Sequence, residues 1–186
     1  MRILKWILIF LPLITFGQTR LDSLILAKIN YHRAGLGINL LMMAPEGLCV
    51  SQNHAKWMAI SGFPSHEQVW EVPDFTNEPN FGLRNWKCGI DTLSPKTVIG
   101  ELIDYQVEAS SFSDVELANL IFNTWINSEE NRLVLEFPDI IWCGISTERG
   151  GILNVVEEDP AIGDFHIVQY AGDYLFVSLN VYNFGR

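Results

Sequence analysis

Residues 113–145 read SDVELANLIFNTWINSEENRLVLEFPDIIWCGI and contain the strongest structural signals in this chain of 186 residues. Ser113 is followed by Glu116 at the spacing of a capping box, in which the two side chains satisfy unpaired N–H groups at the start of a helix. Apolar residues then recur at helical spacing and form one face: Leu117, Leu120, Ile121 and Trp125. The segment therefore predicts an amphipathic helix that begins at Ser113.

A second helix and a strand follow in the same stretch. Asn127-Ser128, followed by two glutamates, is a helix start, and this helix must end before Pro138. At Ile140–Ser146 the pattern changes to that of a buried strand. A helix N-terminus thus meets a sheet at this corner, and the positive end of the helix dipole makes the corner a natural place for a functional site.

Two longer helices are predicted earlier in the chain. Leu21–Ala34 has apolar residues on one face, with Gly35 and Gly37 as stop signals. A second helix starts with Pro45 in its first turn, runs to Ser61 and is closed by Gly62.

The segment Phe63–Thr97 is rich in proline and reads mainly as loop, with a short helix at Asn80–Lys87 that Gly89 ends. Such a connection is long for a compact domain, which indicates either a functional loop or local structure of its own.

The last third of the chain reads as strands and turns. Four strands are predicted, at 140–147, 152–157, 165–171 and 174–184. Turns are predicted at Gly150-Gly151, at Pro160–Gly163 and, with the strongest hairpin signal, at Gly172-Asp173. Because helices come first and strands last, we expect an α+β fold with an antiparallel sheet.

The first eighteen residues have the composition of a secretory signal peptide. Arg2 and Lys5 precede the apolar run Trp6–Phe16, and small residues allow cleavage after Gly17 or Gln18. The run is short for a membrane span, so an uncleaved anchor is the lesser alternative. We expect a signal peptide at 1–18 and a single domain at 19–186, secreted or periplasmic, with no further transmembrane segment.

Charge and cysteine content limit the partners and the chemistry. Loss of residues 1–18 would remove two positive charges and take the formal net charge from −10 to −12, which argues against binding of nucleic acid. Cys49, Cys88 and Cys143 match no zinc-ribbon spacing; they permit one disulfide in any of three pairings, or simply small apolar residues in a core.

Familiar enzyme motifs are absent from the sequence. His66-Glu67 begins like a zincin helix, but Trp70 stands where the second histidine would be. The chain has no G-x-S-x-G nucleophile elbow and no phosphate-binding glycine loop.

The four histidines differ in their sequence settings. His32 lies near a helix end and His54 within a helix among small residues, so we expect structural roles for both, while His166 lies in a strand without an evident partner. His66 is on a loop, and Glu101 follows Gly100, which would let the backbone turn and direct the carboxylate into a cavity.

An ordered series of short motifs completes the pattern: Ile29-Asn30-x-x-Arg33, Leu48 and Ala55, Ser65-His66, Gly100-Glu101, Trp125-x-x-Ser128-x-x-Asn131, Cys143-Gly144 and Asn183-Phe184-Gly185. This series resembles the CAP superfamily (cysteine-rich secretory proteins, antigen 5 and pathogenesis-related 1), in the short bacterial form called SCP-like. The resemblance covers nearly all of the chain after residue 18.

The resemblance implies an α-β-α sandwich with a central antiparallel sheet and a solvent-open cavity lined by histidines and carboxylates. His66 matches the first family histidine, and Glu101 matches the glutamate of the G-E-N motif, although Leu102 replaces its asparagine. Asn131 stands where the family has its second histidine, and Ser128 lies near the place of a second glutamate in eukaryotic members. The candidate cavity residues are therefore His66, Glu101, Asn131 and Ser128.

The departure at Asn131 weakens the expected chemistry. Zinc, if bound, would be held by His66 and Glu101, but an amide oxygen is a poor substitute for imidazole, so we expect no cofactor. His66 and Glu101 could form a general base with its orienting carboxylate, yet no nucleophile is evident, since Ser128 is explained equally well as a helix cap. The structural alternative is that His66, Glu101 and Asn131 form a hydrogen-bonded network that holds the loops on the sheet.

We expect a non-enzymatic binding module for a small molecule, a lipid or an envelope protein. The aromatic residues Phe63, Trp70 and Phe75 would line an apolar surface or cap the core. The alternative function is enzymatic: a metal-assisted hydrolase that uses His66 and Glu101. A third possibility is a domain with only a scaffolding role.

Overall fold

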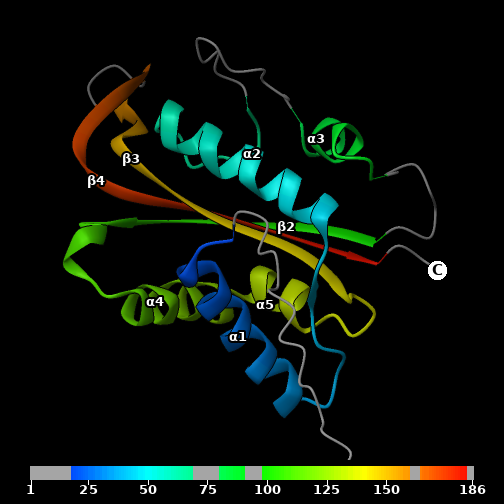
Figure 1. Ribbon diagram of the computed structural model, residues 1–186. Helices are drawn as coiled ribbons and strands as arrows, with labels where there is room; N and C mark the ends of the chain where they lie inside the picture. The colour runs from blue at the N-terminus through cyan, green and yellow to red at the C-terminus, as the bar shows by residue number, and fades with distance from the viewer. Residues whose placement is uncertain (1–17, 69–79, 91–97, 160–163, 184–186) are drawn as a thin grey trace, which may run out of the picture.

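The computed structural model describes residues 18–68, 80–90, 98–159 and 164–183. The predicted signal peptide lies almost entirely outside these residues, as do Trp70, Phe75 and the predicted turn at 160–163. The chain forms three layers (Figure 1), with a sheet between two groups of helices. On one side lie α2 (Pro45–Ser61) and α3 (Phe81–Lys87); on the other lie α1 (Arg20–Gly35), α4 (Asp114–Asn127) and α5 (Glu129–Glu136).

The sheet has the strand order β1-β3-β4-β2 in the described residues. The strands are β1 (Met42–Met43), β2 (Val98–Val107), β3 (Trp142–Asp159) and β4 (Asp164–Asn183). The three long strands are antiparallel, and the short β1 joins β3 in parallel at one edge. The α+β class and the α-β-α sandwich are therefore confirmed, with a mixed sheet where a purely antiparallel one was expected.

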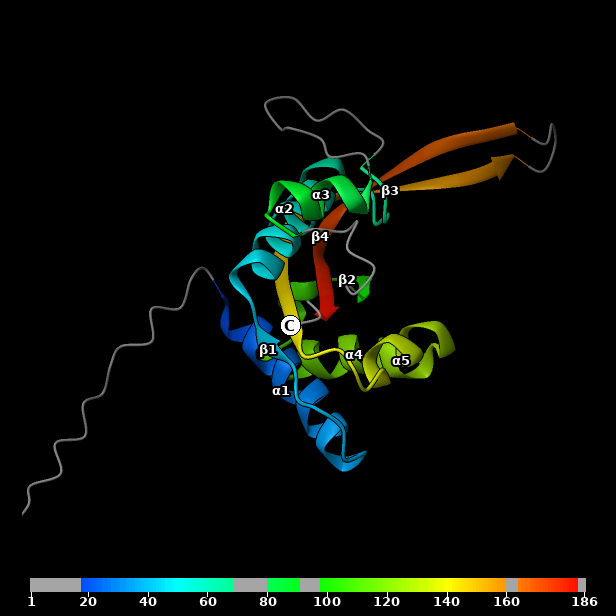
Figure 2. The same cartoon turned by 90° about the vertical axis from the view of Figure 1, so that its right-hand side faces the viewer.

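The predicted turns at Gly150-Gly151 and Gly172-Asp173 are wrong, because β3 and β4 run through both pairs. The pairing of β3 with β4 continues on both sides of the glycines, and its register shifts between Gly150 and Ile152. The strands bend there and continue as a two-stranded ribbon that projects beyond the helices (Figure 2). The four predicted strands are thus parts of two long strands, β3 and β4, and the glycines lie at a bulge between the parts.

The local helix signals are confirmed. Ser113 and Glu116 form a capping box at the start of α4, and Ser128 caps α5 through the backbone N–H of Asn131. Gly62 ends α2 in the left-handed conformation, with φ 73°. Asn80 caps the short helix α3.

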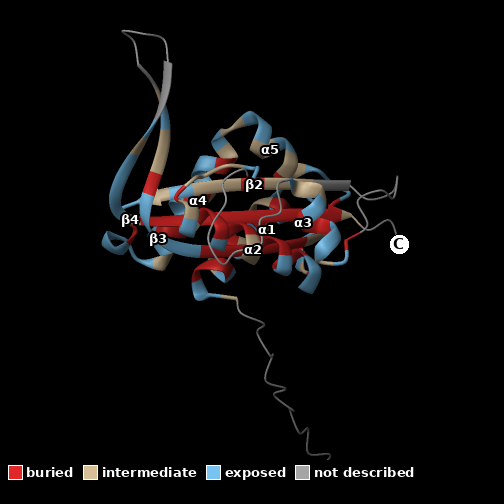
Figure 3. Ribbon diagram, turned by 90° about the horizontal axis from the view of Figure 1, so that it is seen from above, coloured by how far each residue is buried: buried red, intermediate tan, exposed pale blue. Residues whose placement is uncertain are grey.

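Helix α2 packs against the sheet at very close range because both surfaces carry glycine. A Cβ added at Gly144 in β3 would overlap the carbonyl group of Gly47 in α2. The approach lets Ser51 Oγ donate to the Gly144 carbonyl at 2.7 Å, while Asn180 Nδ2 in β4 donates to Ser51 Oγ at 2.8 Å. Polar contacts thus fix the position of α2 over the buried centre of the sheet (Figure 3).

The opposite layer is anchored by the side chains of α1. Asn30 bonds both the N–H and the carbonyl of Leu41, at 2.7 and 2.9 Å. The buried Arg33 donates to four backbone carbonyls, one in the last turn of α5 and three in the loops that follow α1 and α5: Leu135, Asn39, Phe137 and Ile140. The two side chains of the Asn30-x-x-Arg33 motif therefore hold the neighbouring loops against α1 through hydrogen bonds to their backbone.

Strand β2 was not predicted, and the role expected for Gly100 was wrong. Gly100 lies in this strand, outside the positive-φ region that the turn would need. A Cβ at Gly100 would come to 2.9 Å from Val134 Cγ1 of α5. The glycine therefore makes room for α5 on one face of the sheet.

Of the three cysteine pairings left open by the sequence, the structure has Cys49–Cys88, which joins α2 to the end of α3. Cys143 is a buried thiol, and burial raises its pKa to about 12. In the described part of the chain, none of the helices is long and apolar enough to cross a membrane.

Candidate functional site

Glu101 is the centre of a polar cluster on the α2 side of the sheet. Side chains alternate along β2, so Gly100 faces α5 while Glu101 and Ile103 face the α2 layer, where Ile103 joins the cluster around Trp57 and Met58. The side chain of Glu101 is only 3% exposed. A carboxylate so deeply buried needs compensating donors.

Arg84 of α3 supplies the first of these donors. Its fully buried guanidinium places Nη2 at 2.9 Å from Glu101 Oε1 and at 2.8 Å from Oε2. The same Nη2 lies 2.8 Å from the backbone carbonyl oxygen of His66. Arg84 therefore joins α3, the loop after α2 and strand β2.

His66 supplies the second donor from that loop. Its Nδ1 lies 3.0 Å from Glu101 Oε2, and its side chain is 58% exposed. The expected proximity of His66 and Glu101 is thus present in the structure. Among the residues of this cluster, His66 is the one that solvent reaches.

His54 of α2 completes the cluster from beneath. Its Nε2 lies 3.9 Å from Glu101 Oε2, is fully buried and has no hydrogen-bond partner in the described residues. Gln68 Nε2 lies 3.2 Å from His54 Nδ1, and the ring of Trp57 stacks on the imidazole.

The electrostatics of the cluster follow from burial and from charge. Burial of His54 opposes its protonation and lowers its pKa to about 4, so the ring is neutral at pH 7. Burial alone would raise the pKa of Glu101, but the hydrogen bond from His66 and the charge of Arg84 outweigh it and lower that pKa. At pH 7 the cluster therefore contains an ionised carboxylate and a guanidinium cation as a buried pair.

Ser128 and Asn131 lie at the start of α5, in the layer on the other side of the sheet (Figure 1). The hydroxyl of Ser128 accepts the backbone N–H of Asn131 at 3.4 Å, which is a capping contact. In the described residues neither side chain is hydrogen-bonded to His66 or Glu101. The structure thus brings together two of the four candidate residues and adds Arg84 and His54.

A metal ion does not fit this arrangement. Zinc needs free lone pairs on its ligands. Both oxygens of Glu101 already accept a bond from a guanidinium, and a divalent cation beside that group would be repelled. The described residues also contain no group of three His, Cys, Asp or Glu side chains arranged to hold a metal.

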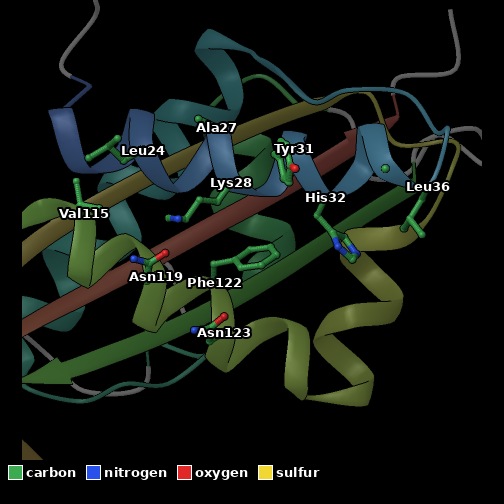
Figure 4. A pocket seen from close by; sticks show the side chains of 11 residues that line it. Leu24, Ala27, Lys28, Tyr31, His32, Leu36, Val115, Asn119, Phe122 and Asn123 are labelled. Atoms are coloured by element: carbon green, nitrogen blue, oxygen red, sulfur yellow. The ribbon is translucent and has the colours of Figure 1, made fainter.

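On the other side of the sheet, an apolar groove lies between α1 and α4, as shown in Figure 4. Its volume is about 630 Å³. Apolar side chains form most of its wall: Leu24, Ala27, Tyr31, Leu36, Val115 and Phe122. Polar atoms enter from Lys28, His32, Asn119 and Asn123.

The groove also accounts for His32. His32 Nε2 lies 2.9 Å from Glu136 Oε1 of α5, and its ring meets the Phe122 ring edge-on at 5.8 Å. A structural role for this histidine agrees with these contacts, which close one end of the groove.

Sequence reasoning missed Arg84 and expected only a structural role for His54. A usable signal existed for His54, since it follows Ser51 by three positions on the buried face of α2. No local pattern marks Arg84. Phe63 packs against the cluster of Trp57 and Leu153, which agrees with a core-capping role. The side chain of His166 lies outside the described part of the structure.

Solved structures show the same fold. One is an extracellular protein containing an SCP domain from Bacillus anthracis, with a TM-score of 0.54 and 19% identity over 88% of this chain. The chain spans only 40% of that protein's length. An outer surface protein from Borrelia burgdorferi has a TM-score of 0.53 and 16% identity, with 88% of this chain and 94% of the other covered. No protein-family model and no curated protein matches the chain. The chain therefore has a CAP/SCP-like fold.

Proposed function

We propose that this chain is a secreted, single-domain CAP-like protein without enzymatic activity, which binds an apolar or amphiphilic small molecule in the groove between α1 and α4. Secretion is supported by the composition of residues 1–18, by an oxidised Cys49–Cys88 pair and by the extracellular and outer-surface proteins that share the fold.

The groove is the observation that carries the proposal. Its volume of about 630 Å³ falls within the range typical of small-ligand sites. Tyr31, which is 86% exposed, and Leu36 stand at its rim and would lose contact with water when a ligand binds. Lys28, Asn119 and Asn123 offer one cation and two amides to a polar head group.

The polar cluster supports the absence of enzymatic activity. Glu101 is held by Arg84 with a lowered pKa, which makes it a weak base, and His54 has no direct contact with solvent. In the described residues no Ser, Thr or Cys side chain is hydrogen-bonded to His66 or Glu101. A metal-assisted hydrolase using these two residues receives less support from this geometry.

A binding titration tests the proposal. The fluorescent fatty acid cis-parinaric acid is titrated into the wild-type chain and into Ala27→Trp, where the new ring fills the groove from an exposed position. We expect saturable binding to the wild type and at least a tenfold weaker affinity in the variant, because the ring removes the space for the chain.

Leu133→Ser is the matched control, since Leu133 is an exposed apolar residue outside the groove. Its affinity should equal that of the wild type. Equal binding by all three proteins, or binding by none of them, would contradict the groove as the ligand site.

A further inference from the structure

We infer that the outer edge of β4 at residues 165–171 pairs with the same edge of a second copy of this chain. The ribbon that carries this edge consists of residues 152–159 of β3 and 164–171 of β4, and it projects beyond the helices (Figure 2). Two ribbons paired in this way form one four-stranded sheet. The inference is independent of the groove between α1 and α4 and of any ligand bound there.

The edge of the ribbon on β4 has no neighbouring strand in the described residues. Strand β2 pairs with β4 only from Tyr174 onward, so the earlier part of β4 extends past the end of β2. The edge on β3 is partly covered by the end of α2. There, the N–H of Asn154 donates to the Gly62 carbonyl at 2.8 Å, and the Asn154 amide donates to the Ser61 carbonyl at 2.7 Å. A new strand therefore fits best along β4.

The backbone along this edge points outward. Because the Asn154 N–H bonds to Gly62, it points away from β4, and Asn154 forms a non-hydrogen-bonded pair with Gln169. The N–H and the carbonyl of Gln169 therefore point away from β3. By the two-residue period of a strand, those of Ile167 and Ala171 do the same. Among the residues that the structure describes, none bonds to these outward groups.

The edge also lacks the features that protect exposed strands from pairing. Such strands commonly carry a charged residue or a proline, whereas residues 165–172 contain no Asp, Glu, Lys, Arg or Pro. Ile167 is 46% exposed, and Val156, its partner on β3, is 55% exposed. An isolated two-stranded ribbon is marginally stable in water, so this one would gain stability from added strands.

The distribution of charge identifies a second copy as the occupant. The acidic run Glu157-Glu158-Asp159 is on β3, and β4 is uncharged along its outer edge. When two ribbons pair in the order β3-β4-β4-β3, the acidic strands lie outermost and the uncharged strands meet at the centre. Like charges that face each other across strands are destabilising, and this order avoids them. A basic peptide, in contrast, would meet no carboxylate along the edge of β4.

The length of the free edge fixes the register. An antiparallel pairing that uses all of residues 165–171 has its two-fold axis at Val168, which places Ile167 opposite Gln169 of the second copy. The outward-pointing residues then exchange backbone hydrogen bonds across the seam. The two Val168 residues face each other as a non-hydrogen-bonded pair, with Cα atoms about 4.5 Å apart. Such a two-fold contact is closed, so it produces a dimer and not a fibre.

Disulfide trapping in the mature chain tests this register. Two cysteines at about that Cα separation can form a disulfide. Under mild oxidation, we expect Val168→Cys to form a covalent dimer in most of the protein, as measured by non-reducing electrophoresis. Val156→Cys is the matched control, since Val156 is exposed on the same ribbon but lies on β3, away from the seam. It should give less than about one tenth of that yield. The native Cys143 is buried and should not contribute.

Sedimentation equilibrium tests the pairing without a covalent link. A seam of seven residues per strand is smaller than a standard interface, so we expect a weak dimer that forms between about 5 µM and about 500 µM protein. Ile167→Lys should weaken it at least about tenfold, because two lysines would then approach each other near the two-fold axis. Gln169→Pro should also weaken it, because proline removes an outward N–H without removing a bond to β3.

Val156→Lys separates pairing along the edge from stacking of the apolar faces. It places the same charge on the same face but away from the seam, so its dimerisation should equal that of the wild type. An equal loss in Val156→Lys and Ile167→Lys would overturn the inference. A wild type that stays monomeric at about 500 µM, together with equal trapping of the two cysteine variants, would also overturn it. Binding of cis-parinaric acid should be unchanged in Ile167→Lys, so failure of this inference is distinguishable from failure of the groove.

Discussion

Glu101 and Asp104 lie on the same strand and experience opposite electrostatic surroundings. Glu101 has a cation and an imidazole beside it, and its pKa is lowered. Asp104 has neutral donors only, the N–H of Tyr105 at 2.8 Å and the amide of Gln106 at 2.9 Å. Burial therefore dominates and raises the pKa of Asp104 to about 6.

Asp104→Asn is expected to stabilise the protein at pH 7.5. A carboxyl group with a raised folded-state pKa destabilises the fold while it is ionised, and this penalty fades as the pH falls from about 6 to the unfolded value of 3.8. The urea midpoint of the variant should exceed that of the wild type at pH 7.5, and the two should coincide near pH 4. Glu116→Gln is the control with the opposite sign, since the pKa of Glu116 is lowered by Ser113. A pH-independent gain in Asp104→Asn would refute this account.

For individual residues, the sequence predicted that His66 and Glu101 lie together, but it did not predict that Arg84 neutralises Glu101. His66 and Glu101 could be paired because both belong to recognisable motifs. Arg84 could not be found, because its position depends on the disulfide and on the path of a long connection. Asn131 occupies the place of a family histidine in sequence, yet its backbone serves the cap of α5.

Among the elements, α2 and β3 depend on each other through Gly47 and Gly144. Gly144→Ala is expected to destabilise the protein by about 3 kcal/mol or more, because its methyl group would overlap backbone atoms, which cannot move aside as a side chain could. Gly151→Ala in the same strand is the matched control: its Cβ would meet only the Gly172 carbonyl, at 4.0 Å. Urea unfolding should separate the two variants clearly. A similar loss in both would mean that strand propensity, and not the close approach of α2, sets the cost.

The elements that the sequence predicted well are those with local signals. Caps at Ser113, Ser128 and Gly62 depend on neighbours along the chain, so the helix ends were correct. The strands were harder, because a glycine pair reads as a turn unless the partner strand is known to continue past it. Strand β2 was missed because Glu101 and Asp104 are three positions apart, which breaks the two-residue alternation typical of a strand, and because the segment follows a loop that contains Pro95.

In the whole molecule, the disulfide joins parts of the α2 layer that are 39 positions apart. Loss of such a link should destabilise the protein by about 4 kcal/mol on the loop-entropy model. We expect the Cys49→Ala/Cys88→Ala double variant to unfold at correspondingly lower urea, and reduced wild type to behave in the same way.

Because the α1–α4 groove is on the other side of the sheet, binding of cis-parinaric acid should survive in the double variant at urea concentrations where it remains folded. A loss of groove binding in the folded variant would show that the two layers are coupled.

The internal position of the Arg84 charge has a consequence for how the cluster around Glu101 is completed. A bound ion must be acquired from the surroundings, and competing chelators can remove it. A guanidinium is synthesised with the polypeptide and cannot be removed in this way. The corner formed by β2, α3 and the end of α2 therefore carries the charge that balances Glu101 as part of the folded chain itself.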